Sequence, residues 1–166
     1  TGRTYSLSAH TLPSARGYGE PLTGRFVLPP GATFTDVIMA QADQPLLMAS
    51  DAGYGFITRF DDLVTRNTKG KALLSLPKGA QPLRPITLEN TSSHLLAAVT
   101  SEGRMLVFPL NKLPAIAKGK GNKIIQIPPK RARERTELLI HLIVVPEEGT
   151  LTIFAGKRFF KLTYGN

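Results

Sequence analysis

The chain has 166 residues, 42% of them hydrophobic, with 15 Gly, 13 Pro and a formal net charge of +9, a composition that suits a β-rich domain with many turns. It contains no cysteine, which excludes disulfide bonds and thiolate metal sites. The sequence has no apolar run of membrane-spanning length and no signal-peptide pattern, so we expect a cytoplasmic location.

Short strands dominate the expected secondary structure, because helical periodicity is almost absent. The candidate strands are partly β-branched or aromatic and are bounded by Gly, Pro or Asp turns. In chain order they cover residues 34–39, 46–50, 55–60, 72–76, 86–89, 95–100, 104–108, 123–127, 138–145, 150–154 and 158–162. One helical turn is expected at residues 61–64 and another at 111–114. Residues 129–137 are expected to form a charged loop that projects from an all-β fold.

A strand–turn–strand pattern recurs along the chain at a spacing of about fifty residues. The clearest copies span residues 46–63 and 96–113, and each turns at a glycine. A looser third copy spans residues 142–154 and turns at Gly149. Strand-filled repeats of roughly 40 to 50 residues are typical of the blades of a propeller-like array.

The second half of the repeat is a basic Gly-rich loop, a short apolar strand and a closing proline. Residues 67–77 match residues 118–128, and a looser version occupies residues 16–29. Glycine permits a tight excursion of the backbone, and proline ends strand pairing. The alignment predicts that core positions are shared by Leu74 with Ile125 and by Leu76 with Ile127, and that Val99 and Met105 face inward.

The repeats divide the chain at residues 12–62, 63–112 and 113–162. The first residues resemble the last candidate strand, since Gly2–Leu7 is similar to residues 156–162. We therefore interpret residues 1–11 as the end of a preceding blade, and residues 1–166 as a fragment of a longer propeller-like domain.

The positive charge is concentrated in one part of the chain. Between Lys112 and Arg135 there are eight cationic residues and a single acidic one, Glu134, whereas the remainder is nearly balanced. A cationic run is often only a solvated loop. Here the basic loops recur in register with the repeats, which favours a polyanion as partner. The residues that we expect to contact it are Arg16, Arg25, Arg66, Lys69, Lys71, Lys118, Lys120, Lys123, Arg131, Arg133 and Arg135.

No catalytic constellation is visible in the sequence. The three histidines have no metal-ligand spacing, and His141 lies in an apolar strand, where a packing role in the core or at an edge is expected. Asp61 and Asp62 are adjacent, so on an extended chain they would face opposite ways. They are better interpreted as the cap of a short helical turn. The Gly-x-Gly strings at residues 17–19 and 119–121 lack the third glycine of a dinucleotide fingerprint.

Three segments, residues 12–24, 46–56 and 118–125, resemble the C-terminal domain of the A subunit of bacterial DNA topoisomerase IV (ParC), which is related to the gyrase A C-terminal domain. The resemblance implies a β-pinwheel, here a fragment of about three four-stranded antiparallel blades with strand exchange between neighbours. It also implies DNA binding along a basic outer rim. The Gln-Arg-Arg-Gly-Gly-Arg-Gly box of gyrase has no match in this chain, which favours topoisomerase IV.

The function implied by the resemblance is sequence-nonspecific binding of double-stranded DNA, which is presented or bent for relaxation and chromosome decatenation. The fragment itself would be non-catalytic, without cofactor or small-molecule substrate. The parent would be an ATP-dependent type II topoisomerase, an A₂B₂ heterotetramer that uses Mg²⁺ and takes ATP through its B subunit. It would act at the nucleoid in the bacterial cytoplasm, or peripherally at the membrane. The alternatives are a gyrase-type DNA-wrapping domain and a propeller-like protein-interaction module.

Overall fold

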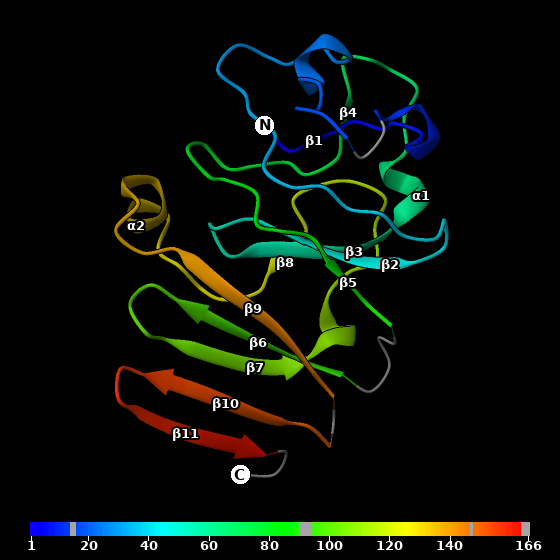
Figure 1. The fold of residues 1–166 in the computed structure, drawn as a ribbon. Coiled ribbons are helices and arrows are strands. Elements are labelled where there is room, and N and C mark those ends of the chain that lie inside the picture. The colour runs from blue at the N-terminus through cyan, green and yellow to red at the C-terminus, as the bar shows by residue number, and fades with distance from the viewer. Residues whose placement is uncertain (14–15, 90–93, 147, 164–166) are drawn as a thin grey trace.

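In the computed structural model, which describes residues 1–13, 16–89, 94–146 and 148–163, the chain forms four antiparallel sheets. Figure 1 shows them following one another through the molecule, from β1–β4 near the N-terminus to β10–β11 near the C-terminus. The strand orders are β1-β4, β5-β2-β3-β8, β7-β6-β9 and β10-β11. The all-β blade architecture expected from the sequence is therefore confirmed, although only one sheet in the described ranges has four strands.

The described residues contain eleven strands and a few short helical segments. The strands are β1 (Arg3–Thr4), β2 (Pro45–Ala49), β3 (Tyr54–Arg59), β4 (Lys71–Ala72), β5 (Ile86–Thr87), β6 (His94–Thr100), β7 (Met105–Pro109), β8 (Asn122–Lys123), β9 (Leu139–Pro146), β10 (Thr150–Ala155) and β11 (Arg158–Thr163). The helical segments are η1 (Ala9–Thr11), η2 (Leu22–Gly24), α1 (Phe60–Leu63), η3 (Leu110–Lys112) and α2 (Pro129–Glu134). None of these helices has the length and apolar content of a membrane span.

The first two predicted hairpins are confirmed, and their turns are built alike. The turn glycines Gly53 and Gly103 have φ values of 85° and 76°, which a side chain would disfavour. Each glycine donates its N–H to the carbonyl three positions earlier, that of Ser50 or Thr100. The hairpins β2–β3 and β6–β7 are thus equivalent units, and a short helical segment follows each, as expected.

The third hairpin lies one strand later than the sequence predicted. Strand β9 does not fold back onto β10; it pairs along its length with β6 of the preceding hairpin. The turn that matches Gly53 and Gly103 is at Gly156, with φ of 61°, between the paired strands β10 and β11. A turn does form at Gly149, whose N–H donates to the carbonyl of Pro146 at 2.7 Å, but it connects two sheets rather than the two strands of a hairpin.

Strand exchange ties the first two blades together. Strand β8, which comes after the whole β6–β7 hairpin, pairs with the edge of β3 through Lys123 opposite Tyr54. The pair β1–β4 repeats this arrangement, with Arg3 opposite Ala72. In both places the apolar residue after the short strand donates its N–H to the carbonyl of a glycine with positive φ: Leu73 to Gly2 and Ile124 to Gly53, at 3.0 and 2.8 Å.

The core follows from the alternation of side chains along β2. Leu46 and Met48 belong to a cluster that faces β1–β4, together with Phe56, Leu63, Leu73 and Leu74. Leu47 and Ala49 face the opposite cluster, shared with the second blade, which includes Leu96, Leu110, Ile124, Ile125 and Ile127. Burial on both faces is what successive strand residues require in a stacked sheet.

The predicted core positions are largely confirmed. Leu74 and Ile125 are both buried, and so is Ile127, whereas its partner Leu76 is half-buried at the margin of the first cluster. Val99 and Met105 pair across β6 and β7 and are half-buried.

Residues 34–39 do not form the predicted strand. Val37 and Met39 are 77% and 81% exposed, and the side chain of Asp36 accepts the N–H of Val37 at 2.8 Å. A hydrogen bond between a side chain and the neighbouring backbone N–H competes with strand pairing. Phe34 instead packs edge-on against Tyr5, with ring centroids 5.6 Å apart. The β-branched and aromatic content of this segment thus serves a small aromatic cluster rather than a sheet.

Residues 129–137 were predicted to form a projecting loop. They instead form the packed helix α2 and the short segment that follows it. Proline stands at the first position of α2, where its missing N–H is harmless. The helix ends at Arg135, the one non-glycine residue with positive φ in the described ranges, at 58°. Glu137, just beyond, is completely buried. Two arginines of the run, Arg131 and Arg135, bind buried carboxylates, as described below.

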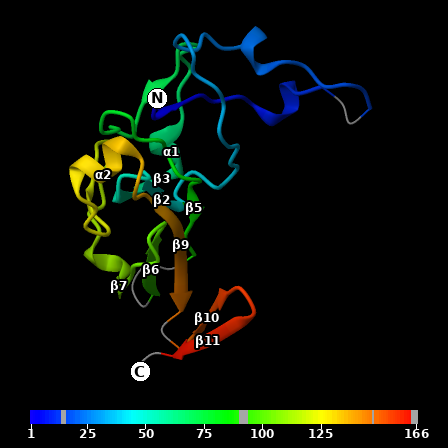
Figure 2. The same cartoon turned by 90° about the vertical axis from the view of Figure 1, so that its left-hand side faces the viewer.

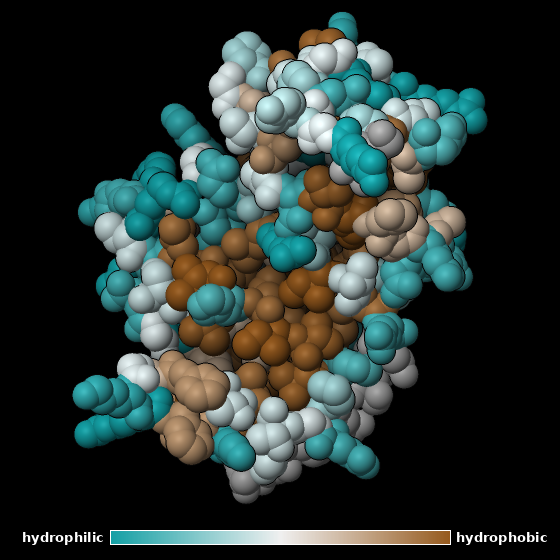
Figure 3. Space-filling view, viewed as in Figure 1, coloured by the Kyte–Doolittle hydropathy of each residue, from teal (hydrophilic) through white to brown (hydrophobic). Residues whose placement is uncertain are grey.

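Seen from the side in Figure 2, the segment that carries η1 and η2 projects away from the stack of sheets. Figure 3 shows apolar side chains gathered over the middle of the face that carries β5 and β9, with hydrophilic side chains around its periphery. On this face the hydrophilic side chains therefore surround an apolar centre.

Candidate nucleic-acid interface

The structure divides the eleven predicted contact residues into cations that are neutralised by acids and cations that are not. Arg25, Arg131 and Arg135 form ion pairs. Lys71 is half-buried, and its ammonium donates to the carbonyl of Asp62. Within the described residues the others form no ion pair and are exposed: Arg16, Arg66, Lys69, Lys118, Lys120, Lys123 and Arg133.

Arg25 fixes the projecting segment. Its guanidinium bonds to the carboxylate of Glu20 and donates to the carbonyl of Thr11 at 2.8 Å. The hydrogen bond from Arg25 holds the pKa of Glu20 below its usual value, and the same bond raises the pKa of Arg25. Arg25 is thus committed to an intramolecular pair.

Two arginines converge on the buried carboxylate of Glu137. Nε of Arg104, from the turn after β6, donates to Oε1 at 2.6 Å, and Nη1 of Arg131 from α2 donates to Oε2 at 3.2 Å. Burial raises the pKa of Glu137, but hydrogen bonds from Arg104, Arg131 and Thr100 outweigh it, so the pKa lies below its ordinary value. Sequence reasoning missed both Arg104 and Glu137. The signal that could have revealed Glu137 was an acidic residue directly before an apolar strand.

Arg135 joins three segments. It donates to Oδ2 of Asp51 in the turn after β2 and to the carbonyl of Gly79, both at 2.9 Å. Asp51 is buried, and its other oxygen accepts the N–H of Gln81 at 2.8 Å. Arg131 and Arg135 are therefore structural residues that hold α2 against both hairpin turns.

The unpaired lysines lie on the two Gly-rich loops. Gly70 and Gly121, with φ of 70° and 75°, precede β4 and β8, and a Cβ at Gly121 would clash with the carbonyl oxygen of Gly55. Only glycine allows each loop to approach the neighbouring hairpin so closely. The loops are also linked, since Gly119 donates to the carbonyl of Leu73 at 2.9 Å. Lys123, in β8 just after the second loop, is exposed as well.

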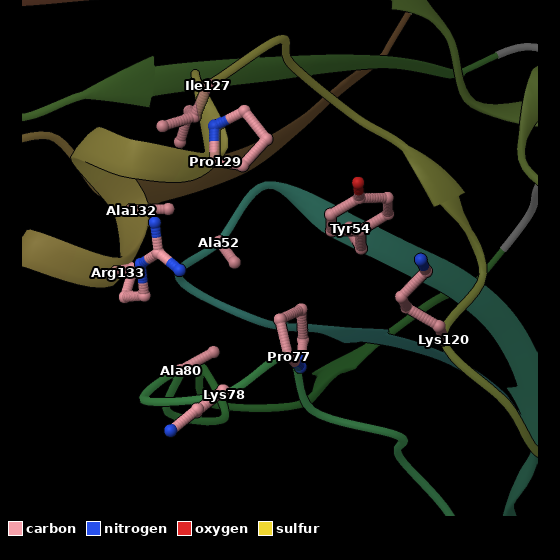
Figure 4. A pocket seen from close by; sticks show the side chains of 10 residues that line it. All are labelled: Ala52, Tyr54, Pro77, Lys78, Ala80, Lys120, Ile127, Pro129, Ala132 and Arg133. Atoms are coloured by element: carbon pink, nitrogen blue, oxygen red, sulfur yellow. The ribbon is translucent and has the colours of Figure 1, made fainter.

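A shallow depression lies where the second Gly-rich loop meets α2 and the first hairpin. Its volume is about 130 Å³, and its lining includes the cations Lys78, Lys120 and Arg133 (Figure 4). Nζ of Lys120 sits 4.4 Å from the centroid of the Tyr54 ring. Lys78 and Tyr54 were not among the predicted contact residues, because each looks isolated in the sequence.

The remaining predicted features carry no chemistry in this structure. The described residues contain no cluster of three or more His, Cys, Asp or Glu side chains suited to a metal ion. His141 is exposed on the edge strand β9. Asp62 accepts the N–H of Arg59 at the start of α1, as a cap should. Of the acidic pair at 147 and 148, Glu148 is exposed and Glu147 lies outside the described residues.

Comparison with known proteins identifies relatives of this fold. A family model described as the DNA gyrase C-terminal domain, a β-propeller, matches residues 44–81 and 94–146. The A subunits of DNA topoisomerase 4 from several bacteria are similar over most of the chain. That of Escherichia coli K12 is 55% identical over 162 residues, and that of Haemophilus influenzae is 54% identical over 158 residues. These matches cover 98% and 95% of this chain but only 21% of each relative, so the chain spans about a fifth of their length.

Solved structures agree with the sequence relatives. The E. coli ParC C-terminal domain superposes with a TM-score of 0.91 at 54% identity, which covers 98% of this chain and 66% of that one. A second structure, the C-terminal domain of a DNA topoisomerase IV, has a TM-score of 0.61 at 12% identity over 79% of this chain and 40% of that one, so it supports the fold alone.

Proposed function

The chain belongs to the DNA gyrase C-terminal domain family, and from this premise we propose that it is an accessory domain of the topoisomerase IV A subunit that binds double-stranded DNA without regard to base sequence. The observation that carries the proposal is the set of exposed, unneutralised lysines on the Gly-rich loops. The buried acids Glu137 and Asp51 pair with other arginines.

The geometry suits recognition of phosphate rather than of bases. Tight glycine loops bring backbone N–H groups and lysines close to a polyanion. No described helix is longer than the six residues of α2, so the described part of the fold presents no recognition helix to a major groove. Binding through phosphates alone is insensitive to sequence and strongly dependent on salt.

Within the parent enzyme, the domain would present a second duplex or bend the bound one, and so favour crossings for relaxation and decatenation. Catalysis would reside elsewhere: in an ATP-dependent type II topoisomerase with Mg²⁺, a B subunit that hydrolyses ATP and a second A subunit. We place that enzyme at the nucleoid in the bacterial cytoplasm. The described residues support a binding role, since their titratable groups are engaged in structural pairs or lie dispersed on the surface.

The test is binding of the 166-residue chain to duplex DNA of random sequence at two salt concentrations. The logarithm of the association constant should fall by roughly 0.9 per log unit of salt for each phosphate neutralised. An affinity that stays flat between low and physiological salt would contradict the proposal. Low salt is the starting point, because this chain spans only part of its structural relative.

Gyrase-type wrapping is the second candidate, because the matching family model is described as a gyrase domain. The chain lacks the basic Gly-rich box of gyrase noted above. Sealing a nicked circle with ligase in the presence of the chain, followed by removal of the protein, separates the two. Chiral wrapping would leave supercoils of one sign, whereas binding or simple bending would leave little net change in linking number.

A further inference from the structure

The depression beside Tyr54 gathers positive charge without any acid to balance it. Lys78 comes from the loop after β4, Lys120 from the second Gly-rich loop and Arg133 from α2 (Figure 4). No carboxylate lines the depression, and the described residues offer these three cations no ion pair. Their neighbours Arg131 and Arg135 instead form ion pairs with Glu137 and Asp51. A concave cluster of one sign attracts a counter-ion.

Hydrogen bonds hold the backbone that carries the three cations, whereas their side chains form no ion pair among the described residues. The loop around Lys78 is tied by Ala80, which donates to the carbonyl of Pro77 at 2.9 Å, and by Arg135, which binds the carbonyl of Gly79. Arg133 lies on α2, which Arg131 anchors to Glu137. The ammonium of Lys120 rests over the Tyr54 ring, which orients the cation without cancelling its charge. Such preorganisation lowers the entropy lost on binding.

Size and lining select the group that fits. Pockets for drug-sized ligands have roughly 300–1,000 Å³, so a depression of about 130 Å³ is too small for a nucleoside but admits a group the size of a phosphate. Pro77, Ile127 and Pro129 form part of the lining and add apolar surface beside the cations.

The depression is not a feature of every repeat. The structural equivalents of Tyr54 and Lys120 in the preceding unit are Arg3 and Lys69, because Gly2 aligns with Gly53 and Gly70 with Gly121. There the guanidinium of Arg3 donates to the carbonyls of Lys69 and Gly70 at 3.0 and 2.8 Å, so no ring stands under the lysine. One junction between blades therefore differs from its neighbour in a way that affects anion binding.

We propose that the depression lined by Tyr54, Lys78, Lys120 and Arg133 binds a single backbone phosphate of duplex DNA and fixes the position of the duplex on the rim. This inference rests on the proposed function and deepens it. A phosphate within a polymer, rather than a free anion, is favoured because Lys118 and Lys123 on the same loop extend the exposed positive surface beyond the depression.

The first test compares two variants that lose the same charge at equivalent positions. Lys120→Gln should weaken binding of a random-sequence duplex about tenfold at low salt, as expected for the loss of one good charge-assisted contact, and should lower the log–log salt slope by about one. Lys69→Gln, the matched control, should weaken binding by less than about threefold. Equal losses of affinity in both variants would overturn the proposed phosphate site in the depression. They would still be compatible with DNA binding that is not localised there. No binding by the parent chain would instead refute the proposed function.

A second variant tests the positioning of the cation at constant formal charge. Tyr54→Leu removes the ring under Lys120 and should weaken duplex binding several-fold. Its fold is checked by circular dichroism and thermal unfolding. Should the Tyr54 variant be unstable, Lys78→Gln, on an exposed side chain, tests a second cation of the depression by removing its charge. If neither substitution changes affinity, the depression does not bind phosphate.

NMR titration distinguishes a phosphate of duplex DNA from free inorganic phosphate as the bound group. With duplex DNA, amide shifts should move at Lys78, Lys120 and Arg133 and saturate with the measured affinity. Inorganic phosphate at an equal concentration of phosphate groups should cause much smaller shifts at those residues. Saturable shifts with inorganic phosphate but none with duplex would show a site for a free anion and overturn the proposal, as would duplex-induced shifts confined to other residues.

Discussion

Nη2 of Arg135 lies 2.9 Å from Oδ2 of Asp51, a residue 84 positions earlier in the chain. The pair joins the end of α2 to the turn of the first hairpin. Arg135 reaches Asp51 from a left-handed backbone conformation with φ of 58°, which an arginine adopts only at some cost. The contact is therefore maintained against backbone strain.

Removal of this contact should destabilise the chain. Asp51→Ala is expected to lower the free energy of unfolding by about 2–3 kcal/mol, because Asp51 is buried and its loss leaves the N–H of Gln81 without an acceptor. The midpoint of urea unfolding at unchanged m-value measures the effect. Asp61→Ala, in the exposed pair with Arg59, is the control and should cost less than about 0.5 kcal/mol. Similar small losses of unfolding free energy in both variants would mean that the contact with Asp51 does not hold α2 in place.

Glu137 should make stability depend on pH. Its pKa in the folded chain lies below the ordinary value of 4.5, so the folded state binds this proton less readily than the unfolded state does. The stabilisation is fully present above the unfolded pKa and is lost as pH falls through the folded pKa.

Unfolding measured between about pH 7 and pH 3 should therefore show a gap between the parent and Glu137→Gln that narrows toward low pH. Glu20→Gln is a suitable comparison, because the pKa of Glu20 is shifted in the same direction but this carboxyl is far more exposed. A constant gap across the range would contradict the assignment of the pKa shift to Glu137.

The close approach at Gly121 predicts a large difference between two glycines of similar φ. Gly121→Ala places a Cβ against the carbonyl of Gly55, whereas Gly103→Ala, with φ of 76°, meets nothing within 4 Å. Both variants bear the strain of positive φ, about 1 kcal/mol. Gly121→Ala should cost at least about 2 kcal/mol more through overpacking. Thermal or urea unfolding gives the comparison, and equal stabilities would mean that β8 is not held against β3.

The Gly-rich loop carries the prediction about the DNA surface. Conversion of Lys118, Lys120 and Lys123 together to Glu should weaken duplex binding and reduce its salt slope while the fold is retained, because all three are exposed. Electrophoretic or anisotropy measurements at low salt provide the readout. Glu148→Lys, at an exposed position between β9 and β10, should not weaken binding. Parent-like affinity in the triple variant would move the interface to another surface.

The sequence was sufficient for features that depend on local chemistry. Turn glycines at 53 and 103, and the apolar residues that follow Gly70 and Gly121, repeat at nearly constant spacing, so hairpins and core positions could be predicted. Strand partners could not, because β9 pairs with β6 through backbone groups that every residue carries. The Gly149 turn was chosen for the same reason: its local composition is right and only the long-range pairing is different.

The division of the cations was beyond sequence reasoning for a related cause. Arg131, Arg133 and Arg135 alternate along one segment and look alike in the sequence, yet two bind carboxylates and the third lines the depression. Their partners Glu137 and Asp51 are brought within reach by the packing of α2. Charge counts predicted where positive residues gather, but only the fold decides which of them remain available to a ligand.

The exchange of β8 into the first blade has a consequence for synthesis on the ribosome. Strand β3 ends at Arg59, and among the described residues its outer edge is covered by residues 114–116, which pair at Ile57, and by β8, which begins at Asn122. At roughly 5–20 residues per second, the nascent chain waits on the order of several seconds with this edge open. Unpaired strand edges are templates for aggregation. The first blade is thus completed only after the second hairpin has emerged, so the two must mature together rather than one after the other.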